Sequence, residues 1–167
     1  YIPIKFNDDF GDVFKLPEFK VDHNVATVPG IDGAKMSKSY GNTIDIFCTE
    51  KELKKATSKI VTDSTPMEDP KDFSTCNIYA LAKLFLGEDE LVALQKRYQQ
   101  GGEGYGHFKA YLNGLIWDYF SEAREKRAYY LAHMDEVKAI LDDGASKARV
   151  IAQEKMNRVR DLVGIYR

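Results

Sequence analysis

The sequence predicts a fold in two parts, an α/β segment over residues 1–60 followed by an all-α bundle over residues 61–167. Three observations support this. Short apolar runs broken by turn residues fill the first 47 residues. From Thr49 onward, apolar residues recur at the three- and four-residue steps of helices. The length of 167 residues allows one good core, or a small domain attached to part of another.

The first segment contains two candidate strands and two turns. Tyr1–Ile4 is a short apolar run, and Val21–Val28 could supply a second strand. Pro29–Gly33 is dense in turn residues and predicts a loop, and Gly41-Asn42 marks a second turn.

Helix signals begin at Thr49, which forms the spacing of a capping box with Glu52 and predicts a helix to about Ile60. The prolines and acidic residues of 64–73 predict a loop. Two more helices follow, each ended by glycine: 74–86 before Gly87, and 88–100 before Gly101-Gly102.

The strongest periodicity begins near His107 and continues for more than four turns, through Phe108, Tyr111, Leu112, Leu115, Ile116, Tyr119, Phe120 and Ala123. Such a stripe favours core packing over a platform for stacking bases. A short helix over 135–141 is expected to end at Gly144. The last helix, 145–163, places apolar residues on one side: Ala148, Ala152, Met156, Val159 and Val163. The second part therefore reads as a small helix bundle.

Composition excludes several classes of protein. Apolar residues make up 44% and charged residues 30%, which argues against disorder. No apolar run approaches the roughly 18 residues of a membrane span. Cys48 and Cys76 are too few for a disulfide framework and favour free thiols in a reducing cytosol. The three histidines have no ligand spacing, so no metal site is predicted.

The net charge of -2 is unevenly distributed. Residues 34–60 carry +3 and residues 145–167 carry +4, whereas residues 1–33 carry -3 and residues 61–144 carry -6. The two positive segments could face a polyanion, or they could be solvated helix faces, which charge alone favours.

The loop Lys35-Met36-Ser37-Lys38-Ser39 offers two ammonium groups and two hydroxyls after a glycine-rich approach. Such a loop can wrap a polyphosphate and stabilise the charge that develops on a leaving pyrophosphate. On composition alone, a flexible surface loop with two solvated lysines is the favoured interpretation.

The string KMSKS resembles the signature of class I aminoacyl-tRNA synthetases. Four later segments resemble the C-terminal region of the tryptophanyl-tRNA synthetase family in the same order, namely Lys59–Ser64, Asn77–Tyr79, Gly104–Lys109 and Ile140–Ala145. Phe6-Asn7, Phe14 and Pro17-Glu18 resemble the segment that precedes the signature in that family. The resemblance covers nearly all of the chain.

The resemblance implies the C-terminal edge of a Rossmann-like catalytic domain followed by a helical anticodon-binding domain. It implies activation of tryptophan with ATP and Mg²⁺, release of pyrophosphate, and transfer to tRNA(Trp) in the cytoplasm by a homodimer. By motif match, Lys35 and Lys38 would be catalytic and hold the triphosphate. Met36, Ser37 and Ser39 would shape and close the loop, and Val28 would contact adenine through its backbone.

The exposed basic side chains expected to face tRNA are Arg124, Lys126, Arg127, Arg149, Arg158 and Arg160. The HIGH-like motif of the family and its tryptophan pocket are absent from the 167 residues, and Ile4 passes directly to Lys5 where relatives carry a further segment. We therefore expect the isolated chain to be unable to form tryptophanyl-adenylate. Tyrosyl-tRNA synthetase, or a non-catalytic tRNA-binding module, remains an alternative.

Overall fold

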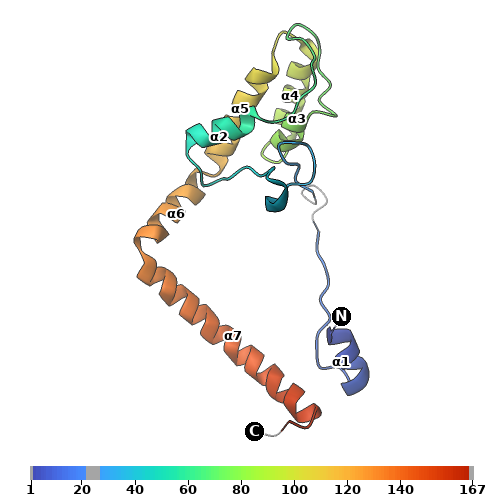
Figure 1. Cartoon of the computed structure of the whole chain (residues 1–167), viewed down its shortest axis with the longest axis vertical. Coiled ribbons are helices and arrows are strands. Elements are labelled where there is room, and N and C mark those ends of the chain that lie inside the picture. Colours follow the sequence, from blue (N-terminus) through green and yellow to red (C-terminus); the bar gives the residue numbers. More distant parts are fainter. Residues whose placement is uncertain (1, 22–26, 166–167) are drawn as a thin grey trace. The chain divides into compact units, whose positions relative to one another are not determined.

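A computed structural model describes residues 2–21 and 27–165 (Figure 1). These residues form seven α-helices and one short 3-10 helix, without a strand. The chain divides into two compact units, which we call the loop unit (residues 21–126) and the terminal unit (residues 1–20 and 127–167). The mostly helical described structure confirms the all-α part of the prediction, but it does not confirm a Rossmann-like edge in residues 1–60.

The loop unit is built on helices that surround α5. Both α2 and α3 pack against α5. The elements of this unit are η1 (Lys38–Tyr40), α2 (Glu50–Ser58), α3 (Asn77–Ala82), α4 (Glu88–Gln100) and α5 (Tyr105–Tyr119).

The predicted apolar stripe forms the centre of the core. Phe108, Leu112 and Ile116 on α5 are all buried, and the ring of Tyr98 from α4 stacks on Phe108 with centroids 3.9 Å apart. Helix α5 stops at Tyr119, which is 64% exposed, but the next residue of the predicted face, Phe120, still packs against the core. The fully buried part of the face comes from its first three turns.

Two helix boundaries follow directly from local chemistry. The Glu52 amide donates to Thr49 Oγ1 at 3.3 Å while the Thr49 amide donates to Glu52 Oε2 at 2.8 Å, which confirms the capping box of α2. Helix α4 has the predicted bounds: it ends at Gln100 and is followed by Gly101, where φ is +70°.

Helix α3 (Asn77–Ala82) is shorter at both ends than the predicted 74–86, because three-residue turn hydrogen bonds follow Ala82 and Asp72 organises the residues before Asn77. Its carboxylate accepts hydrogen bonds from the amide and hydroxyl of Ser74 and from the hydroxyl of Thr75. This local network competes with helical hydrogen bonding, so the helix begins only at Asn77.

The predicted strand at Tyr1–Ile4 is wrong for its described residues, because Ile2–Phe10 form helix α1; Tyr1 lies outside them. Phe6 stacks on Phe10 one turn later, with ring centroids 4.7 Å apart. Asn7 then accepts hydrogen bonds from the amides of Val13 and Phe14, which turns the chain back after α1. Of the second candidate strand, residues 22–26 lie outside the described structure, and its described ends are not in a strand.

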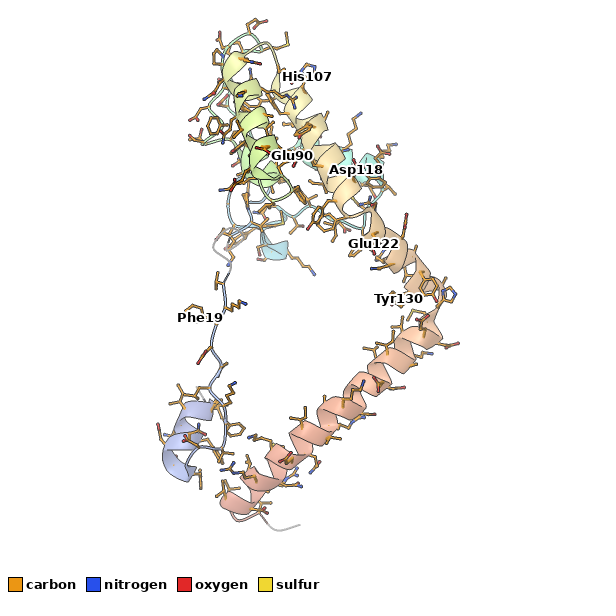
Figure 2. The ribbon with its side chains drawn as sticks, turned by 180° about the vertical axis from the view of Figure 1, so that it is seen from behind. Phe19, Glu90, His107, Asp118, Glu122 and Tyr130 are labelled. Carbon is orange, nitrogen blue, oxygen red and sulfur yellow. The ribbon has the colours of Figure 1, made fainter. Side chains whose placement is uncertain are left out.

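Helices α6 (Ser121–Ala132) and α7 (Met134–Leu162) complete the chain. The predicted stop at Gly144 is wrong, because α7 continues through it. Glycine inside a helix costs only about 1 kcal/mol relative to alanine, and the salt bridge between Lys147 and Asp143, at 2.6 Å, spans this point. No residue of α7 is buried, and side chains project along its whole length (Figure 2). None of the described helices is long and apolar enough to cross a membrane.

Candidate functional site

Residues 28–42 fold into a compact turn that carries the KMSKS string. The Met36 amide donates to the Val28 carbonyl at 2.9 Å, and the Gly30 amide donates to the Ala34 carbonyl at 2.7 Å. Pro29 and Lys35 form an isolated antiparallel bridge. The predicted Pro-Gly loop is thus the tip of a small hairpin that delivers Lys35 at its far side.

The second half of the string forms η1. Its carbonyl at Lys38 accepts the Gly41 amide at 3.2 Å, and Gly41 has a φ of +67°, which favours glycine there. The hydroxyl oxygens of Ser37 and Ser39 lie 2.8 Å apart. The side chains of Lys35 and Lys38 are both exposed, so their ammonium groups are accessible to an anion.

Asn42 lies behind this loop and is 2% exposed. Its Oδ1 accepts the Ser37 amide at 2.8 Å, and its Nδ2 donates to the Lys35 carbonyl at 3.2 Å and to Asp32 Oδ1 at 2.8 Å. A Cβ atom at Gly30 would overlap the amide group of Asn42 and come within 2.7 Å of its carbonyl oxygen. The sequence around Asn42 predicts only a turn. The burial of Asn42 beside Gly30 depends on residues twelve positions apart and has no local pattern.

Backbone and amide hydrogen bonds tie the loop to the helices of the same unit. The Ile31 amide donates to the Asn42 carbonyl at 3.0 Å, and the Val61 amide donates to the Ile31 carbonyl at 2.8 Å. The Val61 carbonyl in turn accepts Asn77 Nδ2 at 3.1 Å, at the start of α3. The loop is therefore held by the segment between α2 and α3.

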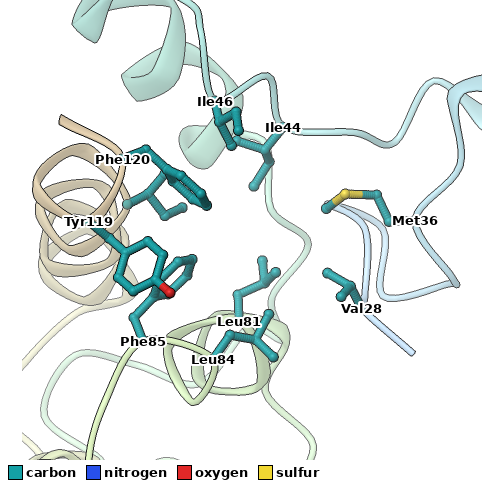
Figure 3. A pocket seen from close by; sticks show the side chains of 10 residues that line it. Val28, Met36, Ile44, Ile46, Leu81, Leu84, Phe85, Tyr119 and Phe120 are labelled. Carbon is teal, nitrogen blue, oxygen red and sulfur yellow. The ribbon is translucent and has the colours of Figure 1, made fainter. Parts of the chain in front are cut away.

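An open apolar pocket of about 270 Å³ lies beside the loop (Figure 3). Val28 and Met36 form one wall, which faces α3 and the end of α5. The other lining residues are Ile44, Ile46, Leu81, Leu84, Phe85, Ile116, Tyr119 and Phe120. Ligand pockets commonly begin near 300 Å³, so the space suits one planar ring system better than a whole nucleotide.

A second, polar pocket of about 240 Å³ lies between the segment after α2 and the start of α5. Here the Tyr105 hydroxyl donates to Asp63 Oδ1 at 2.8 Å. Burial, together with this hydrogen bond, raises the pKa of Tyr105 to about 12. Hydrogen bonds from Thr65, and then from Tyr105, lower the pKa of Asp63, so the pair is a charge-assisted hydrogen bond at neutral pH.

Two of the six basic residues expected to face tRNA lie in the loop unit. The guanidinium of Arg124 lies over the Trp117 ring, 3.7 Å from its centroid, and donates to the Trp117 carbonyl. Lys126 forms an exposed salt bridge at 2.6 Å with Glu122, which Figure 2 labels at the start of α6. The stacking of Arg124 orients Trp117 and the connection into α6.

The other four basic residues lie in the terminal unit: Arg127, Arg149, Arg158 and Arg160. Arg158 donates to the Asp12 carbonyl at 3.1 Å, and the nearby Lys155 donates to the Val13 carbonyl at 2.6 Å. Arg149 is exposed on α7. The structure therefore places the six residues predicted to bind ATP within one compact turn, namely Val28, Lys35, Met36, Ser37, Lys38 and Ser39. It distributes the six basic residues over two units.

Metal-binding side chains are not grouped at this site. Within residues 2–21 and 27–165, no cluster of three or more His, Cys, Asp or Glu side chains could hold a metal ion. The loop instead presents cations, which suit an anionic ligand rather than a metal.

Residues 3–120 match the model of the family described as tRNA synthetases class I (W and Y). The chain is 58% identical, over 98% of its length, to the tryptophan–tRNA ligase of Campylobacter jejuni strain RM1221, and 47% identical to that of Fusobacterium nucleatum. It covers 51% and 50% of those proteins, so it spans about half the length of the curated relatives it matches.

Solved structures agree with these matches. The crystal structure of tryptophanyl-tRNA synthetase from Campylobacter jejuni complexed with ADP and tryptophan superposes with a TM-score of 0.85 at 58% identity, over 98% of this chain and 51% of that one. The family match includes the hairpin and η1, which carry the two lysines. The chain therefore belongs to the class I tRNA synthetases of the tryptophan and tyrosine family.

Proposed function

We propose that this chain provides the signature loop and the helical part of a tryptophan–tRNA ligase. The observation that carries the proposal is the geometry of the KMSKS loop, in which two exposed lysines project from the hairpin and from η1, and the buried side-chain amide of Asn42 holds the backbone between them. Its support from relatives is that the proteins 58% and 47% identical to it bear that name. The tyrosyl alternative has no comparable support.

The chemical role of the loop is to stabilise the leaving group of tryptophan activation. A carboxylate oxygen of tryptophan attacks the α-phosphorus of ATP, the bond from that phosphorus to the bridging oxygen breaks, and pyrophosphate leaves with the bonding electrons. Lys35 and Lys38 place two positive charges where the negative charge on pyrophosphate grows. Mg²⁺ enters bound to the ATP phosphates, and no protein ligand for it is assigned.

The apolar pocket provides a position for the adenine ring. Val28 and Met36 form a wall of about the right size for one planar base, while the backbone of Val28 adjoins the hairpin. The related structure contains ADP together with tryptophan. Ser37 and Ser39 supply hydroxyls next to the phosphates, so all six loop positions contribute to one ATP site.

The helical part would recognise tRNA(Trp). We assign the end of the catalytic domain to residues 1–60 and the anticodon-binding domain to residues 61–167, in a cytoplasmic homodimer. The basic residues that would contact the RNA backbone are Lys126, Arg127, Arg149, Arg158 and Arg160. In this assignment Arg124 acts through Trp117, because its guanidinium already lies over that ring.

The test is tRNA charging by the complete gene product, with tRNA(Trp) and tRNA(Tyr) each supplied with its own amino acid. The proposal predicts charging of tRNA(Trp) alone. Charging of tRNA(Tyr) alone would move the same residues to the sister enzyme. Binding of tRNA without charging would identify a non-catalytic module. The 167-residue chain serves as a control that should not form the adenylate.

A further inference from the structure

We infer that Asn42 is the positioning residue of the signature loop, acting with Asp32 to fix the backbone from which Lys35 and Lys38 project. The inference rests on the proposed function, since it concerns how the same loop reaches the leaving pyrophosphate. Neither Asn42 nor Asp32 is proposed to contact the phosphates; Asn42 acts by positioning the two lysines.

The hydrogen-bond partners of Asn42 determine how its side chain must be oriented. The Ser37 amide can only donate, so it must face the amide oxygen of Asn42, whereas the Lys35 carbonyl can only accept and must face the amide nitrogen. Asp32 Oδ1 accepts the second hydrogen of that nitrogen at 2.8 Å. No other side chain of similar size supplies one acceptor and two donors in this arrangement.

The contacts clamp the loop on both sides of Met36. The carbonyl of Lys35 and the amide of Ser37 are both held by one side chain, so the backbone from Lys35 to Ser37, the residue before η1, cannot rotate freely. At 2% exposure, Asn42 is shielded from water that would compete for these bonds.

The base of the clamp is fixed as well. Asn42 accepts the Ile31 amide through its own carbonyl at 3.0 Å, and Gly30 leaves no space for the Asn42 side chain to move toward it. Asp32 is held by accepting the Ala34 amide at 3.0 Å. The two lysines are thus presented from a preorganised backbone, which lowers the entropic cost of organising them around the triphosphate.

The first experiment is a donor–acceptor swap in the complete gene product, read by steady-state ATP–pyrophosphate exchange. Asn42→Asp places two carboxylates against each other and should lower kcat about 100-fold, the order expected for a displacement near 1 Å. Adding Asp32→Asn restores a hydrogen bond between positions 32 and 42, because the amide nitrogen at position 32 can donate to the carboxylate at position 42. The carboxylate at position 42 still accepts the Ser37 amide. The double variant should recover at least about tenfold over Asn42→Asp, with the KM for tryptophan unchanged in both.

Asn157→Ala is the matched control, because Asn157 lies on α7 and accepts a hydrogen bond from Gln153 at 2.7 Å. It should retain wild-type kcat. A merely structural role for Asn42 predicts reduced thermal stability with kcat unchanged in the folded fraction. That result, or a double variant no more active than Asn42→Asp, would overturn the inference.

A second variant protects the test against misfolding. Asp32 is exposed, so Asp32→Ala removes one partner of Asn42 without opening the core, and it should lower kcat about tenfold at a nearly unchanged melting temperature. Amide hydrogen exchange on the 167-residue chain gives a readout that needs no catalysis. Asn42→Ala should accelerate exchange at Ser37 about tenfold or more but leave Leu53, in α2, unchanged.

These arms separate the two claims. Absence of tryptophan-dependent ATP–pyrophosphate exchange by the wild-type gene product would refute the proposed function. Slow amide hydrogen exchange at Ser37 would still support the clamp. Normal activation by Asn42→Asp, or unchanged Ser37 exchange in Asn42→Ala, would refute the clamp and leave the proposed function standing.

Discussion

The substitution Gly30→Ala tests the packing of the signature loop with a single methyl group. The new Cβ would overlap the amide of Asn42, which is itself buried and hydrogen-bonded to three residues of the loop. Carbon contacts are comfortable near 3.5 Å, so Asn42 or the hairpin must shift by about 1 Å. Asn42 cannot shift without weakening its bonds to Lys35, Ser37 and Asp32.

The magnitude follows from the bonds at risk. Loss of two or three hydrogen bonds at about 1 kcal/mol each gives a destabilisation of roughly 2–3 kcal/mol. A 1 Å displacement of the lysines should lower kcat for ATP–pyrophosphate exchange about 100-fold. The assay is exchange by the complete gene product, together with urea unfolding.

The matched control is Gly114→Ala in the middle of α5, where a Cβ would meet no atom within 4 Å. Alanine is the better helix former, so this variant should gain about 0.5–1 kcal/mol and keep full activity. Equal stability and activity for Gly30→Ala and wild type would refute the packing described for the loop.

Three further predictions follow from other contacts. Lys38→Ala should lower kcat for exchange by about 100- to 1000-fold with little change in the KM for tryptophan, because the lost charge acts on the leaving group; an equal rise in KM alone would contradict this. Lys71 is 3% exposed and its ammonium donates to three backbone carbonyls, so Lys71→Met should lower the free energy of unfolding by about 3 kcal/mol, measured by urea denaturation, and a loss under about 1 kcal/mol would count against it. The hydrogen bond and charge of Arg97 lower the pKa of Glu103, so the ion pair stabilises the folded protein fully above the unfolded pKa of about 4.3 and less as pH falls below it. Melting temperatures measured from pH 7 to 3 should therefore fall less steeply in acid for Glu103→Gln than for wild type, and parallel curves would disprove the coupling.

Local sequence chemistry predicted several elements well. The capping box at Thr49 and Glu52 placed the start of α2, and the Gly pair after Gln100 placed the end of α4. The spacing of Phe108, with the residues one and two turns later, identified the buried face of α5. These features depend on residues within four positions of one another, so a local pattern contains the whole signal.

Other features depended on distant partners and could not be read this way. Asn42 is defined by its contacts with Gly30, Asp32 and the loop, although the sequence around it indicates only a turn. Ile2–Phe10 forms a helix where a strand was predicted, and Asn7 accepts the amides of Val13 and Phe14 after it, a contact that apolar composition does not reveal. Gly144 carries the usual stop signal, but one glycine inside a helix costs only about 1 kcal/mol, and the salt bridge between Lys147 and Asp143 spans it within α7.

The candidate site was predictable to the extent that its motif is contiguous. Lys35 and Lys38 lie on one compact loop as expected, while Val28 contacts Met36 of that loop through its carbonyl and lines the same pocket as Met36. The basic residues were less predictable, because charge does not say which partner a side chain takes. Arg124 lies over Trp117, and Arg158 binds a backbone carbonyl near α1.

The most direct test of the proposed function is ATP–pyrophosphate exchange by the complete gene product, with tryptophan and tyrosine compared side by side. The control is the double variant Lys35→Ala/Lys38→Ala, which lacks both lysine side chains of the loop. The account predicts exchange that depends on tryptophan, is absent with tyrosine and falls sharply in the double variant. Exchange with tyrosine alone, or tryptophan-dependent exchange that survives loss of both lysines, would contradict it.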